Sequence, residues 1–93
     1  MIQMEEKDYQ ILKQIFGKYP YTFYVYGSRV KGTARKFSDL DVCYQEDIPL
    51  AVISDIREEL EESDLPFIVE LVNWKHMRTS FQEMIKGDLT RLE

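Results

Sequence analysis

The chain has 93 residues, a mass of 11.1 kDa and a hydrophobic fraction of 44%, which suffices for one core and leaves no room for a second substrate domain. A net charge of −5 and a pI near 4.9 exclude a broad electrostatic affinity for nucleic acid, so direct nucleic-acid binding is not expected. The single cysteine cannot form an intrachain disulfide, no apolar run approaches the roughly 20 residues of a membrane span, and the acidic start lacks a signal-peptide pattern, so we expect a cytoplasmic protein with no membrane contact.

The first half of the chain predicts a helix, a strand and a short second helix. Apolar side chains at helical spacing, with acids in the first turn, predict a helix over residues 5–18 that Pro20 ends. The aromatic and β-branched run at residues 21–26 predicts a strand. Residues 28–31 are predicted to form a short helix whose first N–H groups could face an anion, and residues 32–37 a loop.

The second half continues the alternation. Residues 39–44 predict a strand, residues 50–62 an amphipathic helix with a very acidic outer face, and residues 66–72 a third strand. The remaining tail is less regular, with a helix expected around residues 80–86 and ended by Gly87. An α/β class follows from this alternation.

The segment of residues 27–36 reads G-S-R-V-K-G-T-A-R-K and is the strongest local charge in the chain. It holds four cations and no acid, although the whole chain is acidic, so it favours a small phosphorylated ligand. A Gly-Ser pair after a strand is commonly only a turn. In this setting, however, the candidate anion-binding residues are Gly27, Ser28, Arg29 and Lys31.

A pair of aspartates follows almost at once. Asp39 and Asp41 are two residues apart, so a strand would direct both carboxylates to one face. Glu70 is the only charge in the third predicted strand, and burial there would require it to be paired, protonated or bound to a metal. A solvated strand edge for the aspartates, and a salt bridge from Glu70 to Arg29 or Lys31, are the alternatives. Together the three carboxylates could meet around Mg²⁺, which takes oxygen ligands.

Other reactive residues lack the partners that chemistry would need. Cys43 and His76 have no neighbours that suggest a zinc site or a Cys-His nucleophile. The G-x-x-x-x-G of residues 27–32 has Thr33 where a P-loop has lysine, so it is not a P-loop. Tyr24 and Tyr26 are expected in the sheet core.

These residues carry a family resemblance. Gly27-Ser28, ten intervening residues, Asp39-Leu40-Asp41 and an acid in the following strand resemble the signature of the DNA polymerase β-like nucleotidyltransferase superfamily. The sequence of residues 27–42 resembles that of its minimal nucleotidyltransferases, small proteins encoded beside HEPN-domain proteins. The resemblance implies that residues 1–93 form one minimal nucleotidyltransferase domain of α/β (α+β) fold, with a mixed three- to four-stranded sheet and helices packed mainly on one face.

The resemblance also implies roles for the acids and for the turn. Gly27 and Ser28 would bind the triphosphate, while Asp39 and Asp41 would hold the metals of a two-metal Mg²⁺ site. Glu70 matches the third carboxylate, which is more usually aspartate in the family.

Two cations would complete the nucleotide site. Arg29 falls on a position that the family commonly keeps basic, and Arg29 and Lys31 would offset the phosphate charge.

The implied reaction moves AMP from ATP onto a partner, a HEPN-domain toxin that the chain would neutralise as its antitoxin. The alternative is a catalytically weak or inactive antitoxin that neutralises the HEPN partner by direct binding. A hetero-oligomer with that partner is expected, and self-association is left open.

Overall fold

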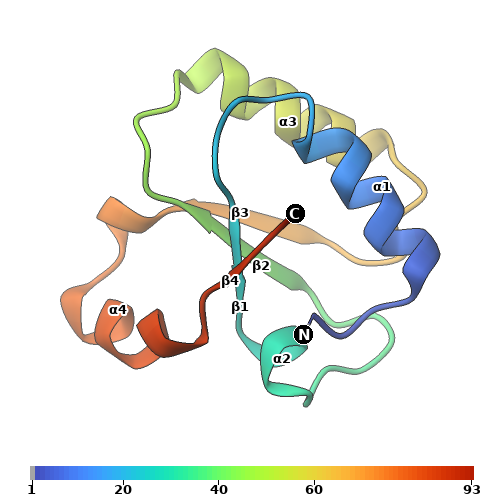
Figure 1. The fold of residues 1–93 in the computed structure, drawn as a ribbon. Coiled ribbons are helices and arrows are strands. Elements are labelled where there is room, and N and C mark those ends of the chain that lie inside the picture. Colours follow the sequence, from blue (N-terminus) through green and yellow to red (C-terminus); the bar gives the residue numbers. More distant parts are fainter. Residues whose placement is uncertain (1) are drawn as a thin grey trace.

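The computed structural model describes residues 2–93, whose elements alternate along the chain as the sequence predicts (Figure 1). In chain order they are α1 (Glu6–Phe16), β1 (Tyr24–Tyr26), α2 (Ser28–Lys31), β2 (Leu40–Tyr44), α3 (Leu50–Glu62), β3 (Val69–Asn73), the 3₁₀ helix η1 (Trp74–His76), α4 (Thr79–Ile85), the 3₁₀ helix η2 (Lys86–Asp88) and β4 (Thr90–Arg91).

The strands form one mixed sheet in the order β3-β2-β1-β4. The central strand β1 is antiparallel to both β2 and β4, whereas β2 and β3 are parallel. The register places Tyr26 opposite Asp41, and Asp41 opposite Glu70. This is the mixed four-stranded α+β fold that the sequence predicts, and β3 is left as an outer strand.

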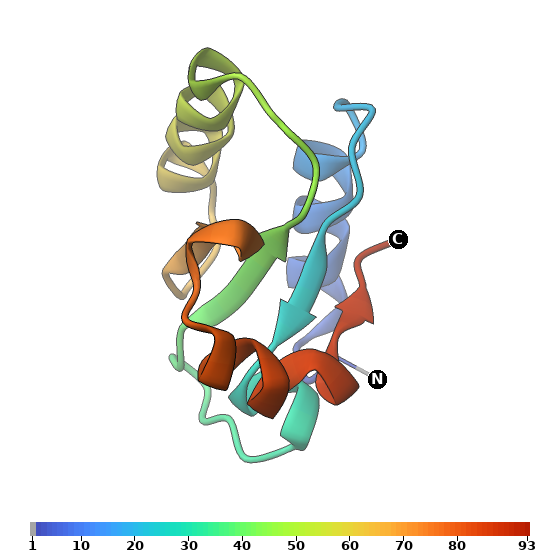
Figure 2. The same cartoon turned by 90° about the vertical axis from the view of Figure 1, so that its left-hand side faces the viewer.

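One face of the sheet carries the main core. Side chains that alternate along the strands, such as Val25 and Val42, pack with Leu12 of α1 and Ile53 of α3, and all four are buried. In Figures 1 and 2, α1 and α3 lie side by side above the sheet. The two longest helices therefore cover the same face, as expected.

The opposite face has a smaller apolar cluster. Tyr26 and Cys43 pack there with Ile85 of α4, which lies below the sheet in Figure 2. Because side chains alternate along a strand, Asp41 and Glu70 belong to this same face. Because α4 covers only part of this face, polar side chains can lie beside it on the sheet.

The element bounds differ from the predictions mainly at the strands. The first strand begins at Tyr24, because Thr22 donates its backbone N–H to the side chain of Glu46, at 2.6 Å, and stays outside the ladder. The third strand is displaced to Val69–Asn73. A helix was expected around residues 80–86 of an otherwise less regular tail, and the structure adds β4, in which Thr90 and Arg91 pair with β1.

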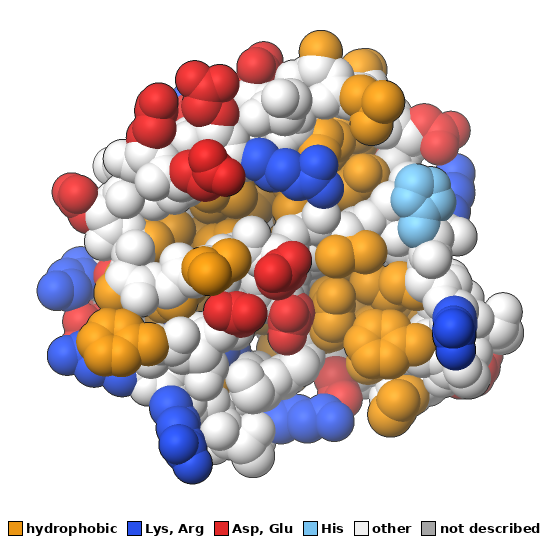
Figure 3. All heavy atoms as spheres, turned by 180° about the vertical axis from the view of Figure 1, so that it is seen from behind, with side chains coloured by type: hydrophobic (Ala, Val, Ile, Leu, Met, Phe, Trp, Pro, Cys, Tyr) orange, Lys and Arg blue, Asp and Glu red, His pale blue; other side chains and the backbone are white. Residues whose placement is uncertain are grey.

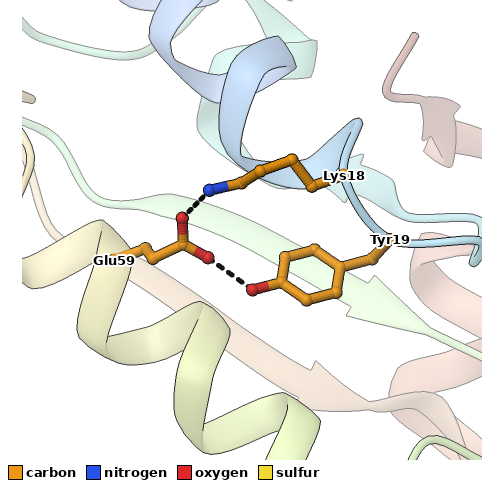
Figure 4. A network of polar contacts seen from close by, with 3 residues as sticks. All are labelled: Lys18, Tyr19 and Glu59. Carbon is orange, nitrogen blue, oxygen red and sulfur yellow. Dashed lines mark hydrogen bonds and ion pairs between the residues drawn. The ribbon is translucent and has the colours of Figure 1, made fainter.

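A polar network joins the end of α1 to α3 (Figure 4). Lys18 and Tyr19 follow α1, and both contact the carboxylate of Glu59 on α3, one at each oxygen. The network ties together the two helices over the main core. Among residues 2–93, no helix is both long enough and apolar enough to span a bilayer.

Candidate active site

The turn between β1 and α2 has a backbone that only glycine adopts readily. Gly27 has φ 84° and ψ −154°, and it is the residue immediately before α2. Its carbonyl accepts hydrogen bonds from Val30 and Lys31, which close the first turn of α2. The earlier N–H groups of α2 have no partner within the helix, because a helix start lacks preceding carbonyls. The turn therefore has donors for an anion, as the sequence predicts.

Asp41 lies directly against this turn. A Cβ built on Gly27 would lie only 2.5 Å from Oδ2 of Asp41 and 3.4 Å from Cγ. The missing side chain of Gly27 thus leaves the space that the Asp41 carboxylate occupies. The predicted phosphate turn and the predicted metal ligand are direct neighbours.

The other two predicted acids act on the same carboxylate. Burial raises the pKa of Asp41 above 3.8, and the charges of Asp39 and Glu70 raise it further. Tyr26, in register with Asp41, has its pKa raised to about 12 by burial and then by Asp41, so its phenol stays protonated. The structure therefore gathers Asp39, Asp41 and Glu70 into one acidic cluster. Figure 3 shows acidic side chains grouped at the centre of one face of the molecule.

The acidic cluster is not closed into a metal-binding geometry. Among the residues that the structure describes, no three His, Cys, Asp or Glu side chains converge closely enough to hold an ion. The donor chemistry nevertheless fits a hard divalent cation, since all three groups are carboxylates and their mutual repulsion is relieved by a positive charge. The metal assignment of Asp39, Asp41 and Glu70 stays a prediction.

The structure corrects the reasoning about Glu70. Its burial in an apolar strand was expected, but Glu70 is exposed because β3 is an outer strand. The alternative salt bridge to Arg29 or Lys31 is also wrong, since Lys31 pairs with Asp88 at 3.9 Å and Arg29 contacts backbone carbonyls. What places Glu70 near the site is its register opposite Asp41.

Arg29 has a structural position that the sequence does not reveal. Its side chain is 4% exposed and donates to the carbonyls of Gln3, Lys36 and Ser38 at 2.8 to 3.1 Å. The guanidinium also lies 4.1 Å from the ring centre of Phe67. These contacts hold the loop before β2, and the nucleotide-binding role of Arg29 stays a prediction.

Lys31 remains available to an anion. It is exposed at the end of α2, and its ion pair with the partly exposed Asp88 of η2 is long, at 3.9 Å. Cys43 is fully buried and burial raises its pKa to about 11, which agrees with its exclusion as a nucleophile.

Arg57 is a neighbour of the site that sequence reasoning missed. It reaches from α3 to the carbonyl of Leu71 on β3, at 2.9 Å. One signal was available, because Arg57 is the only cation in α3. A cation among so many acids indicates a specific contact.

Comparison with known proteins agrees with this site. Residues 10–91 match the family model described as "Polymerase beta, Nucleotidyltransferase". A relative from Haemophilus influenzae (strain ATCC 51907 / DSM 11121 / KW20 / Rd), named "Probable protein adenylyltransferase MntA", is 41% identical over 68 residues, which cover 71% of this chain and 60% of the relative. The matched part of the chain thus spans less than two thirds of that relative.

Two solved structures share the fold. A crystal structure of a toxin-antitoxin with AMP-PNP has a TM-score of 0.68 at 19% identity, covering 91% of this chain and 72% of that one. A toxin-antitoxin MntA-HpeT mutant with two aspartates replaced by glutamate has a TM-score of 0.58 at 17% identity, covering 92% of this chain and 71% of that one. The matching family model spans nearly the whole chain, from helix α1 to strand β4. The chain therefore belongs to the polymerase β nucleotidyltransferase family.

Proposed function

We propose that this chain transfers AMP from ATP to a hydroxyl group of a partner protein, with Mg²⁺ bound at the acidic cluster. The observation that carries the proposal is the position of Asp41 against Gly27. A group held by the turn would lie beside the carboxylates, as phosphoryl transfer requires of its substrate and metal ligands.

The chain's own groups would divide the work. Backbone N–H groups of the Gly27-Ser28 turn and the ammonium of Lys31 would bind the β- and γ-phosphates. Asp39, Asp41 and Glu70 would hold Mg²⁺, which supplies charge stabilisation at the oxygens of the reacting phosphate.

Bond making and proton transfer complete the proposed reaction. The partner's hydroxyl oxygen bonds to the α-phosphorus, the bond from that phosphorus to pyrophosphate breaks, and a carboxylate accepts the hydroxyl proton. Asp41 or Glu70, next to the attacking hydroxyl, would be that acceptor.

The proposed acceptor is a HEPN-domain toxin, which the chain would silence as its antitoxin in the cytoplasm. The relative named a probable protein adenylyltransferase supports a protein acceptor, and the two toxin-antitoxin structures of the same fold support the pairing. Residues 1–93 would serve as one domain that relies on the partner to complete the acceptor site.

The second candidate is an antitoxin that acts by binding alone. Two observations favour it: the described acids do not converge on one ion, and glutamate stands at the position that matches the family's third aspartate. An incomplete metal site would leave the docking surface intact while removing transfer.

The test is the mass of a HEPN-domain partner after incubation with this chain, ATP and Mg²⁺. The expected result is one or more adenylates on the partner, lost on removal of Mg²⁺ with EDTA. Glu70→Gln should lower transfer by orders of magnitude, and Glu70→Asp should retain it. The control is Glu62→Gln, an exposed acid on α3. A silenced partner of unchanged mass would contradict transfer and support the binding antitoxin.

A further inference from the structure

The outer edge of β3 is open to another strand. The backbone N–H of Leu40 donates to the carbonyl of Ile68 at 2.9 Å, so Ile68 and Glu70 direct their backbone groups toward β2. The alternate residues Val69 and Leu71 then direct theirs outward. The contact from Arg57 to the carbonyl of Leu71 confirms this direction and occupies that one acceptor, so the groups open to another strand are those of Val69 and the N–H of Leu71. Within residues 2–93, β3 has β2 as its sole strand partner.

A groove runs along this edge. It has a volume of about 890 Å³ and lies between β3, α3 and the loop before β2, with Arg57 and Leu60 on the α3 side. Two large apolar side chains of its lining are exposed, Ile68 at 64% and Phe37 at 66%. Figure 3 shows recessed hydrophobic surface beside the acidic cluster on this face. Exposed apolar side chains next to a strand edge with open backbone groups, here those of Val69, are typical of a strand-binding site.

The charge of the groove selects its occupant. Three carboxylates line it, those of Asp39, Glu61 and Glu70, against the single cation Arg57. The chain as a whole also has a net charge of −5, so a second copy of it would be repelled. A partner with Lys or Arg among apolar residues is complementary.

We propose that the edge of β3 binds an extended, basic segment of the acceptor protein as a fifth strand of the four-stranded sheet. That the bound protein is the acceptor rests on the proposed function. The register gives the reason for this location: a residue paired beside Glu70 points to the same sheet face as Glu70 and Asp41. A hydroxyl side chain on such a segment would approach the acidic cluster directly.

The variant that tests the edge is Val69→Pro. Proline removes the outward N–H of Val69 and leaves the bonds between β3 and β2 intact, and it is tolerated at outer strands for this reason. The matched control, Val69→Thr, keeps the N–H and the branched shape. Ile68→Lys is a second variant at a 64% exposed site, where a new cation repels a basic ligand without disturbing the core.

The probe is a fluorescent peptide of alternating valine and lysine, measured by anisotropy against the full chain. Wild type and Val69→Thr should bind it, whereas Val69→Pro and Ile68→Lys should bind about tenfold more weakly. The same peptide with alternate backbone nitrogens methylated should lose binding to wild type, which tests strand pairing without altering the protein. A peptide of alternating valine and glutamate should also bind more weakly.

ATP binding with Mg²⁺, measured by calorimetry on Val69→Pro, separates this inference from the proposed function. Unchanged ATP affinity with lost peptide binding supports the docking edge. Absent peptide binding to wild type, equal binding by Val69→Pro, or a wild-type dimer at the β3 edge overturns it. Failure of wild type to bind ATP would instead overturn the proposed function. Peptide binding would still test whether the β3 edge pairs with an added strand.

Discussion

Asp41 occupies the space that a side chain at Gly27 would fill. A Cβ at Gly27 would come within 2.5 Å of Asp41 Oδ2, and the glycine also has φ 84°. Two separate features of the sequence, the Gly-Ser turn and the D-L-D strand, are therefore one site in space.

Replacing Gly27 by alanine should damage both stability and nucleotide binding. The backbone strain is worth about 2 kcal/mol of unfolding free energy, and the clash displaces Asp41. The measurements are urea unfolding and calorimetric ATP titration with Mg²⁺. Gly32→Ala is the control, because Gly32 has φ 77° but a Cβ there meets no atom within 4 Å. It should cost about 1 kcal/mol and leave ATP affinity unchanged. Equal ATP affinity in wild type and Gly27→Ala would refute the turn as the phosphate site.

Asp41→Asn should stabilise the metal-free protein at neutral pH. The folded state raises the pKa of Asp41 above 3.8, so it favours the protonated acid. The stability that Asp41 contributes is thus fully present below pH 3.8 and is lost as the pH rises through the folded pKa. Melting temperatures of wild type and variant should converge in acid and separate in favour of the variant toward neutrality.

Mg²⁺ should reverse this order. Its binding favours the ionised carboxylates, so Mg²⁺ should raise the melting temperature of wild type and have little effect on Asp41→Asn. Asp55→Asn, at an exposed position on α3, is the control and should respond to Mg²⁺ as wild type does. An equal Mg²⁺ shift in Asp41→Asn would remove Asp41 from the metal ligands.

Arg29→Lys should destabilise the fold although it keeps the charge. The guanidinium of Arg29 donates to the carbonyls of Gln3, Lys36 and Ser38. The single ammonium group of a lysine side chain cannot reach all three. A loss of about 3 kcal/mol in unfolding free energy is expected, because a buried charge loses hydrogen bonds to backbone carbonyls. Arg35→Lys, at an exposed position of the same loop, should change it by about 0.5 kcal/mol or less. A small loss of unfolding free energy in Arg29→Lys, together with a large loss of ATP affinity, would instead support the predicted nucleotide-binding role of Arg29.

The network of Lys18, Tyr19 and Glu59 should contribute mainly through the tyrosine. Side-chain exposures of 57% for Lys18 and 29% for Glu59 make their ion pair weak. Lys18→Met should therefore cost about 0.5 kcal/mol and Tyr19→Phe about 1 kcal/mol of unfolding free energy. A double-mutant cycle of Tyr19→Phe with Glu59→Gln measures their coupling. Additive effects would show that the hydroxyl contact carries no stability.

Local pattern in the sequence determines most of the elements. The helical spacing of Leu12 and Ile15, and of Ile53 and Ile56, predicts α1 and α3, because one apolar face of each helix must be buried. The short helix at Ser28–Lys31 also follows from the Gly residues that bound it. The spacing of Gly27, Asp39 and Asp41 likewise identifies the family without any structure.

Tertiary structure alone decides what the charged residues do. Arg29 and Lys31 are two residues apart and look alike in sequence, yet one is buried against carbonyls and the other is exposed. Strand β4 has only two residues, too few for a periodic signal, and pairing with β1 creates it. The sequence predicts that Glu70 is a buried charge, whereas the strand order places β3 at the edge of the sheet and leaves Glu70 exposed. Burial, pairing and edge position depend on which segments meet across the sheet, and such long-range contacts are not encoded in any one stretch of the sequence.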